Sequence, residues 1–399
     1  MHPIYLDNAS TTPILPEVRE AMLPYLSGRY GNPSSLHSLG REARQAIEDA
    51  RLEIAEALGA AGDEIVFTSG GSEADNLAIK GVACALRRQG RHIITTAIEH
   101  HAVLRTCHFL EKEGFRVTYL PVDGDGLVDP LELQRAITDD TILVSIMHAN
   151  NEVGTIEPIK ELSQIAREES VVFHTDAVQT FGHLPIAVNR LGVDLLSMSA
   201  HKLNGPKGIG ALYVRNGTPV EPLIHGGAQE KKRRASTENV PGVVGFGTAT
   251  RIAAREMGTL ERSTTRLRNR LLNGILRDIE YTRLNGHPTM RLPGNINTTI
   301  RYVDGESVVL AMDRKGICIS TASACATGDP EPSHVLTAMG INSLDIHSAV
   351  RISLGRENTR KEIDTTQHAL AETIQGLREI SPLYPPGPSD GQTPTGQGR

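Results

Sequence analysis

Short apolar runs alternate with amphipathic stretches over residues 62–215. Most of the runs are rich in β-branched residues and are bounded by Gly, Asp, Asn or Pro, which is typical of strands. Seven strands are predicted: EIVFTS (64–69), HIITTA (92–97), RVTYLPV (116–122), TILVSIM (141–147), VVFHTD (171–176), VDLLSMSA (193–200) and IGALYVR (209–215).

Helix-like segments separate several of these runs, as at 73–90 and 158–170. The alternation indicates an α/β fold with a mainly parallel, seven-stranded sheet and helices on both faces. Ahead of the sheet, residues 41–59 place a small apolar stripe on one helical face and end at a glycine. The stripe consists of Ala43, Ile47, Ala50, Ile54 and Ala57.

A long helical pattern at about 241–280 leads into a second region with strand-like NINTTIRYV and AVRISLG. We therefore expect a smaller α+β domain, with two strands and two or more helices. The predicted division is a large domain at 15–260, a small domain made of 1–14 and 261–380, and a tail at 381–399. The tail is rich in Pro, Gly and Ser and is expected to be disordered.

Composition and charge limit the classes of molecule that the chain is expected to bind. The chain has 399 residues and a formal net charge of −6, which argues against direct binding to nucleic acid or to an anionic membrane. It has no apolar stretch of the roughly 18 residues that span a bilayer. The first ten residues lack the basic and apolar regions of a secretory signal, so a cytoplasmic location is expected.

Four cysteines are present, without CxxC spacing, so no zinc site is predicted and free thiols are expected. Cys84, and with it Cys107 and Cys318, reads as a small apolar residue. Cys325 differs because it lies among small residues, followed by Gly, Asp and two prolines, where no apolar stripe fits. We interpret it as a nucleophile on an accessible loop rather than an adventitious thiol.

The segment FTSGGSEADN (67–76) runs from a strand through glycines into a helix. A helix N-terminus with glycines and a hydroxyl at Ser72 is a plausible phosphate cradle, with Gly71 allowing close backbone approach. The alternative is that Ser72 is an ordinary helix N-cap.

Two further side chains follow apolar runs. Asp176 is either a cap or the partner of a buried cation such as a pyridinium nitrogen. Lys202, flanked by Ser199 and His201, is either a solvated lysine or an amine held for Schiff-base chemistry. A phosphate cradle, an acid and an amine in this order together indicate pyridoxal phosphate.

Two other residues fit such a site. His100 follows a strand, where an imidazole could stack on a flat ring and move protons, with His101 as the competing candidate. Arg351 lies inside an apolar strand pattern, where its guanidinium suits the carboxylate of an amino acid. A structural salt bridge is the alternative for Arg351.

Nine ordered motifs carry a resemblance to a known family, over roughly residues 4–375. They are YLDNASTTP, GNPSSLHSLG, FTSGGSEADN, EHHAV, MHANNEVG, HTDAVQ, SAHKLNGPKG, SACATGDPEPSHV and VRISLGREN. The chain resembles the cysteine desulfurases, NifS-like enzymes of the class V aminotransferase group with the fold of type I pyridoxal-phosphate enzymes.

The resemblance implies a role for each matching residue. Lys202 would bind the cofactor aldehyde, Asp176 the ring nitrogen and Gln179 the phenolic oxygen, while His100 would stack on the ring. Ser72, Ser199 and His201, with Gly71, would hold the phosphate. Asn151 would contact ring or substrate, and Asn8 and Arg351 the substrate carboxylate. Thr237 would reach the cofactor of a partner subunit, which requires a homodimer. Cys325 would accept the sulfur, and could also serve as a transient iron–sulfur ligand.

The implied reaction converts L-cysteine to L-alanine and passes the sulfur, as a persulfide, to an acceptor protein. Iron–sulfur assembly, thiolation and DNA phosphorothioation remain open as destinations. Selenocysteine lyase or another class V enzyme is the nearest alternative; a nicotinamide enzyme or an inactive scaffold is more distant.

Departures from the family pattern are small, such as Ser10 in place of an alanine. The basic cluster EKKRR (230–234) is read as a solvated loop.

Overall fold

The central sheet contains all seven strands that the apolar runs predict. The computed structural model describes residues 3–321 and 332–385. Among the described strands of this sheet, β8 runs in one direction and the other six run in the opposite direction. In spatial order the strands are β2 (Ile65–Thr68), β8 (Gly210–Val214), β7 (Leu195–Ser199), β6 (Val172–Asp176), β5 (Thr141–Ser145), β3 (His92–Thr96) and β4 (Arg116–Leu120). The predicted α/β architecture is therefore confirmed.

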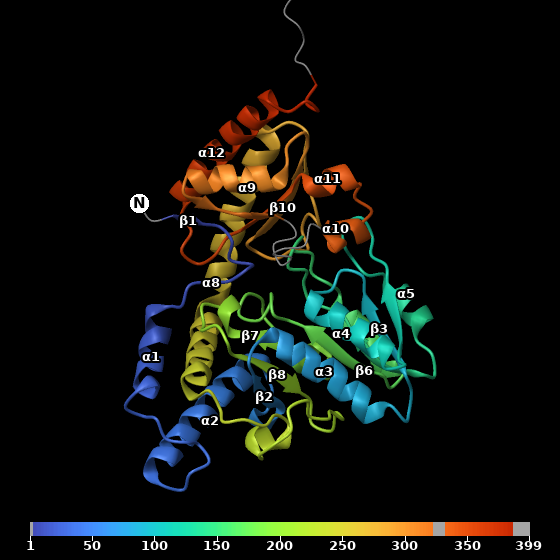
Figure 1. Ribbon diagram of the computed structural model, residues 1–399, viewed down its shortest axis with the longest axis vertical. Helices are drawn as coiled ribbons and strands as arrows, with labels where there is room; N and C mark the ends of the chain where they lie inside the picture. The colour runs from blue at the N-terminus through green and yellow to red at the C-terminus, as the bar shows by residue number, and fades with distance from the viewer. Residues whose placement is uncertain (1–2, 322–331, 386–399) are drawn as a thin grey trace, which may run out of the picture.

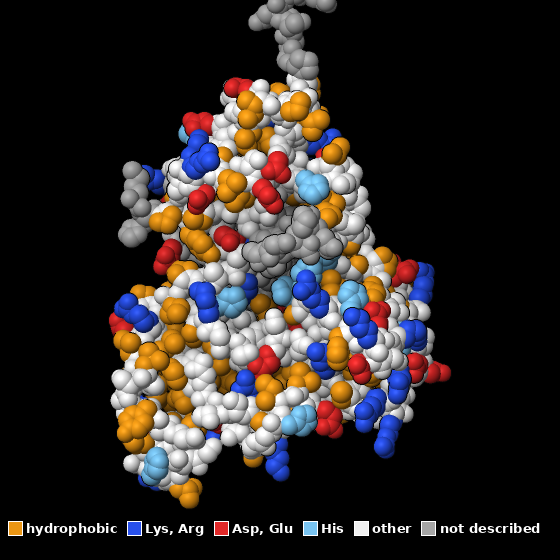
Figure 2. Space-filling view, in the orientation of Figure 1, with side chains coloured by type: hydrophobic (Ala, Val, Ile, Leu, Met, Phe, Trp, Pro, Cys, Tyr) orange, Lys and Arg blue, Asp and Glu red, His pale blue; other side chains and the backbone are white. Residues whose placement is uncertain are grey.

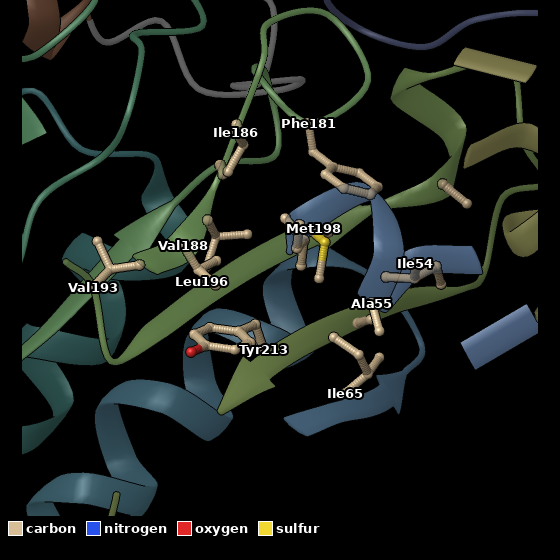
Figure 3. Close-up of a cluster of buried hydrophobic side chains, with 14 of the residues drawn as sticks. Ile54, Ala55, Ile65, Phe181, Ile186, Val188, Val193, Leu196, Met198 and Tyr213 are labelled. Atoms are coloured by element: carbon tan, nitrogen blue, oxygen red, sulfur yellow. The ribbon is translucent and has the colours of Figure 1, made fainter. Parts of the chain in front are cut away.

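Alternate residues of each strand point to opposite faces, and each face has its own apolar cover. On one face α3 (Gly71–Leu86) and α4 (His101–Lys112) pack against residues such as Leu195 and Leu212. On the other, Leu196, Met198 and Tyr213 meet a second set of helices, and Figure 3 shows these side chains beside Ile54 and Ala55. That set comprises α1 (Pro16–Leu26), α2 (Ser38–Leu58), α5 (Pro130–Ala136), α6 (Ile159–Glu168), α7 (Val188–Leu191) and the first half of α8 (Val240–Asp278).

Helix α2 buries the apolar stripe that the sequence predicts for residues 41–59. Its stripe residues Ala43, Ile47, Ala50 and Ile54 are buried, and Ala57 is partly buried. The helix ends where Gly59 takes a left-handed conformation (φ 65°), whose N–H bonds the carbonyls of the last turn.

A smaller sheet builds the second region, at the top of Figure 1. The sequence predicted two strands here, and the antiparallel sheet has four. Helix α8 joins the two regions, since it packs Phe246 into the first core and Leu271 into the second. The small-region elements are β9 (Thr282–Leu284), β10 (Asn295–Ile300), β12 (Ser320–Thr321), β13 (Ala349–Ser353), α9 (Gly305–Arg314), α10 (His334–Ala338), α11 (Ser343–His347) and α12 (Arg360–Glu379).

The N-terminal segment links the two regions. Strand β1 (Ile4–Tyr5) pairs in parallel with β11 (Ile317–Cys318) of the small region. Farther along, the Thr12 N–H and hydroxyl both donate to the carbonyl of His201 in the large region, at 3.0 and 2.8 Å. Residues 4–12 therefore pass directly across the junction where the site lies.

The structure adds detail to two sequence expectations. Cys84, read as a small apolar residue, has an exposed side chain on α3, whereas Cys107 is buried. Residues 381–385, assigned to the tail, are described, and the Tyr384 ring lies 5.7 Å from that of Tyr302. No helix in the described ranges combines the length and apolar character needed to cross a membrane.

The cluster at 230–234 is also more than a solvated loop. Glu230 is buried and receives two 2.8 Å hydrogen bonds from the guanidinium of Arg51, and a third from the Phe67 N–H. Lys231 and Lys232 are exposed, but both have left-handed backbones (φ 55° and 69°). Such conformations are costly for non-glycine residues, and the buried ion pair beside them opposes that cost.

We predict that Glu230→Ala lowers the free energy of unfolding by about 3 kcal/mol, because the buried guanidinium of Arg51 would lose its buried partner and keep only the exposed carboxylate of Glu48 at 3.1 Å. The measurement is urea unfolding followed by circular dichroism, since the chain has no tryptophan. The control is Glu20→Ala: the Arg19–Glu20 pair is exposed, so its loss should cost within about 0.5 kcal/mol. Equal costs for the two variants would contradict the role of the buried pair.

Candidate active site

The amine of Lys202 lies at the carboxyl edge of the central sheet. Strand β7 ends at Ser199, and the short 3₁₀ helix η2 (Ala200–Lys202) follows at once. Lys202 Nζ donates to the carbonyls of Ala9 (2.5 Å) and Ser10 (2.7 Å). Gln179 Nε2 donates to the same Ala9 carbonyl at 3.0 Å. The structure thus brings Lys202 and Gln179 together on the N-terminal segment.

Asp176 ends β6, the strand beside β7, and its side chain is buried. Its Oδ1 accepts a 2.8 Å hydrogen bond from the Val178 N–H, so the residue caps a turn and not a helix. Burial raises the pKa of Asp176, while the hydrogen bond from Val178 and the charge of Lys202 oppose that rise. An additional cation at this carboxylate would favour its ionised form.

The strand, glycine turn and helix predicted at residues 67–76 form at the start of α3. The helix begins at Gly71 with Gly70 as N-cap, so the reading of Ser72 as an N-cap is wrong; Ser72 belongs to the first turn. A Cβ added at Gly71 would lie 2.6 Å from Val178 Cγ2 and 3.6 Å from Ser199 Cβ. Glycine therefore lets the first turn of α3 approach the ends of β6 and β7 closely, with Ser72 and Ser199 at the same edge.

His201 completes this edge from the N-terminal side. Its Nδ1 lies 3.1 Å from the hydroxyl of Thr11. Burial, with the nearby charges of Lys202 and Lys207, lowers the pKa of His201 to about 4. The ring is therefore neutral near pH 7 and can donate or accept a hydrogen bond.

His100 is the N-cap of α4, and its Nδ1 accepts a 3.1 Å hydrogen bond from the Ala102 N–H. Its proton must therefore lie on Nε2. Burial, then the charge of Lys202, lowers the pKa of His100 to about 4. The competing candidate, His101, instead lies against His334, with ring centroids 4.8 Å apart. Figure 2 shows histidine side chains gathered where the two lobes meet.

Arg351 is almost fully buried in β13, where it makes the salt bridge that was one of the two readings left open by the sequence. Its Nη2 donates to Asp7 Oδ1 (3.0 Å) and Ser10 Oγ (2.7 Å), so a structural salt bridge exists. Its Nη1 donates to the Asn151 carbonyl at 3.1 Å. Its Nε is buried without a hydrogen-bond partner in the described ranges, which leaves one donor for a carboxylate.

Asn8 contacts the same strand as Arg351. Its Nδ2 donates to the carbonyl of Ser353, two residues after Arg351, at 2.9 Å. Asn8 and Gln179 also line a cleft between the two regions, together with residues such as Thr12 and Ser353. The site therefore has an amine and an acid on the large region, and a guanidinium on the small region.

Comparison with known proteins agrees with this arrangement. The family model Aminotransferase class-V matches residues 4–366. The chain belongs to the cysteine desulfurases of this family. It is 56% identical over 382 residues to the protein named Cysteine desulfurase IscS from Methanosarcina thermophila, covering 96% of this chain and 94% of that protein. It is 55% identical to the protein of the same name from Dictyoglomus turgidum, covering 95% and 96%.

Solved structures are similar as well. A structure titled NifS-like protein matches with a TM-score of 0.89 and 39% identity, covering 94% of this chain and all of that chain. A structure titled SspA in complex with cysteine matches with a TM-score of 0.79 and 39% identity, covering 88% and 98%. The fold of the cysteine desulfurases is thus shared along nearly the whole chain.

For two residues that the cysteine desulfurase resemblance singles out, the structure shows only the surroundings and no contact with the other site residues. Thr237 is exposed, on a loop that an Arg234–Glu73 ion pair (2.9 Å) ties to the first turn of α3. Cys325 lies outside the described residues. Its described flanks lie near the site, because Ser320 pairs with Arg351 and His334 Nε2 lies 2.8 Å from the carbonyl of Glu99.

Other residues of the site escaped sequence reasoning. Asp7 and Ser10 are separated from Arg351 by more than 340 residues, so their contact left no local signal. Behind Asp176, the buried polar residues Asp75 and His174 stand within an apolar helix and an apolar strand. A carboxylate inside an otherwise apolar helical stripe is the one signal that could have singled out Asp75.

We predict that His100 stays neutral, with its proton on Nε2, from about pH 8 down to about pH 5.5, because a folded-state pKa near 4 lies well below the usual 6.5. Nitrogen NMR of histidine-labelled protein measures this, with His100→Gln identifying the resonance. A titration midpoint near 6.5, or a proton on Nδ1, would contradict the geometry of the α4 cap.

Proposed function

We propose that this chain is a pyridoxal-phosphate-dependent cysteine desulfurase. L-cysteine and the thiol of Cys325 would give L-alanine and a Cys325 persulfide. The observation that carries the proposal is the meeting of Lys202, Asp176 and the Gly71–Ser72 turn at one edge of the sheet. These are the amine, acid and anion site that pyridoxal phosphate needs.

The residues present fit this cofactor. The first turn of α3, Ser72, Ser199 and His201 would hold its phosphate, since open N–H groups and hydroxyls at a helix N-terminus favour an anion. Asp176 would bind the ring nitrogen, Gln179 the phenolic oxygen, Asn151 the ring or substrate, and His100 the ring face. The bound cofactor would supply an aldehyde for amines and a ring that withdraws electrons from the substrate α-carbon.

The chain's own groups would do the remaining work. Arg351 and Asn8 would orient the substrate carboxylate, with the Nε donor of Arg351 as one contact. Lys202, positioned by two carbonyls of the N-terminal segment, would take the α-proton. His100, neutral and protonated on Nε2, would pass a proton to or from the substrate thiol. The Cys325 thiolate would attack the substrate sulfur.

We also propose a homodimer and a sulfur-acceptor protein. Thr237 would contact the phosphate held by a partner subunit, which suits an exposed residue tied through Arg234 to the turn beside Ser72. The persulfide would pass to an acceptor for iron–sulfur assembly, thiolation or DNA phosphorothioation. A cytoplasmic location remains a prediction.

The test is to incubate the cofactor-loaded protein with L-cysteine and a thiol reductant and to quantify alanine and sulfide. We expect one alanine for each sulfide. Cys325→Ala should lower the rate at least about 100-fold, because the nucleophile is lost, while the yellow cofactor absorbance remains. Cys84→Ala is the matched control, since Cys84 is an exposed thiol on α3 and should be dispensable.

The same assay separates the alternatives. Selenocysteine lyase activity would persist in Cys325→Ala and would exceed cysteine activity in the unmutated protein. Absence of alanine with fully loaded protein would contradict the proposed function.

A further inference from the structure

A second buried carboxyl group lies close to Asp176. Asp75, one turn into α3, is 1% exposed, and its Oδ1 has no hydrogen-bond partner in the described part of the chain. The same oxygen lies 3.7 Å from His174 Nε2. His174 Nε2 in turn lies 2.9 Å from the Ser197 hydroxyl.

The register of the sheet places this group beside Asp176. His174 and Asp176 are two residues apart on β6, so they share one face, and Ser197 of β7 is the direct partner of Asp176. Helix α3 covers this face. Asp75 therefore faces a polar strip formed by His174, Asp176 and Ser197.

The charged groups around Asp75 do not favour its ionised form beside Asp176. His174 is neutral near pH 7, because burial lowers its pKa to about 3, so it lends no positive charge. The other titratable groups that face Asp75 are the carboxyls of Asp176 and Glu99, and burial raises the pKa of Glu99 to about 8. Burial, then the charge of Asp176, raises the pKa of Asp75, and the hydrogen bond from Ser197 only partly opposes this.

Two buried carboxyl groups this close cannot both ionise at low cost, so they behave as one titrating unit. A buried, incompletely hydrogen-bonded acid is also expensive to keep in a core. A free-energy cost of this kind is typical of residues that serve a functional site, and Asp75 lies beside one.

We propose that Asp75 is a positioning residue for the ring nitrogen of the cofactor: Asp75 and Asp176 share one proton in the cofactor-free protein and release it to solvent when the cationic ring docks against Asp176. This inference rests on the proposed function. In this step the O–H bond of the shared proton breaks and a buffer base accepts the proton; the reaction of the cofactor aldehyde with Lys202 would be the same in every variant compared. The docked ring would then face two carboxylates instead of one.

The test is calorimetric titration of cofactor-free protein with pyridoxal phosphate near pH 7. PIPES and HEPES differ in ionisation enthalpy and lack primary amines, so the two titrations together give the number of protons released. Asp75→Asn keeps the shape of the side chain but holds no exchangeable charge, and it should release about one proton fewer than the unmutated protein.

Glu157→Gln is the matched control. Glu157 is also buried in the large region, has an oxygen without a partner among the described residues, and has a pKa raised to about 8 by burial. Its carboxyl is hydrogen-bonded to the Val128 N–H, and it should release as many protons as the unmutated protein. Equal release by all three proteins would overturn the inference.

A second measurement covers the case in which Asp75→Asn does not bind the cofactor. A carboxyl whose folded pKa is raised contributes stability at low pH and loses it as pH rises. The urea midpoint of Asp75→Asn should therefore exceed that of the unmutated protein by a margin that grows from pH 5 to pH 8. A constant margin would overturn the shared proton. If the unmutated protein bound no pyridoxal phosphate, the proposed function would fail, and this measurement would still decide whether Asp75 holds a proton.

Discussion

The site depends on the N-terminal segment that lies between the two halves of the molecule. Its Ala9 and Ser10 carbonyls receive the Lys202 amine, and its Asp7 carboxylate and Ser10 hydroxyl receive the Arg351 guanidinium. Two cations from different regions are thus held by neighbouring residues of one turn, at residues 7–10. The relative positions of the amine and the guanidinium follow from this arrangement.

Ser10 takes part in both contacts. Its hydroxyl accepts from Arg351 and donates to Asp7 at 2.9 Å, while its carbonyl accepts from Lys202. The alanine that related proteins are expected to carry at this position would keep the carbonyl contact and lose the hydroxyl contacts. The Ser10 hydroxyl therefore gives the guanidinium of this chain a second side-chain acceptor beside Asp7.

The two faces of the central sheet differ in the polarity of their side chains. One face packs apolar side chains against α2 and α8, and Figure 3 shows part of this cluster beside Ile54 and Ala55 of α2. The opposite face is apolar under most of α3 but changes to a polar strip near the carboxyl ends of β5, β6 and β7. The strip consists of Ser145, His174, Asp176, Ser197 and Ser199, with Asp75 above it. Stability comes mainly from the first face, and the second accepts polar burial next to the site.

The large sheet could be predicted because each of its strands is a run of four or five residues between clear boundaries, mostly buried in every strand except the edge strand β4. The strands β1, β9, β11 and β12 could not, because two or three residues carry no periodicity and their pairing depends on distant partners. The same limit applies to the site. Asp176, Ser199 and Lys202 stand at predicted strand ends, whereas Asp7 and Asp75 matter only through contacts made after folding.

The most direct test of the account is chemical. Borohydride reduction of the loaded protein, followed by proteolysis and mass spectrometry, identifies the lysine that bears the cofactor. The account predicts a pyridoxyl group on the peptide that contains Lys202. A label on the exposed Lys207 of the same loop instead, or no label on any lysine, would contradict it.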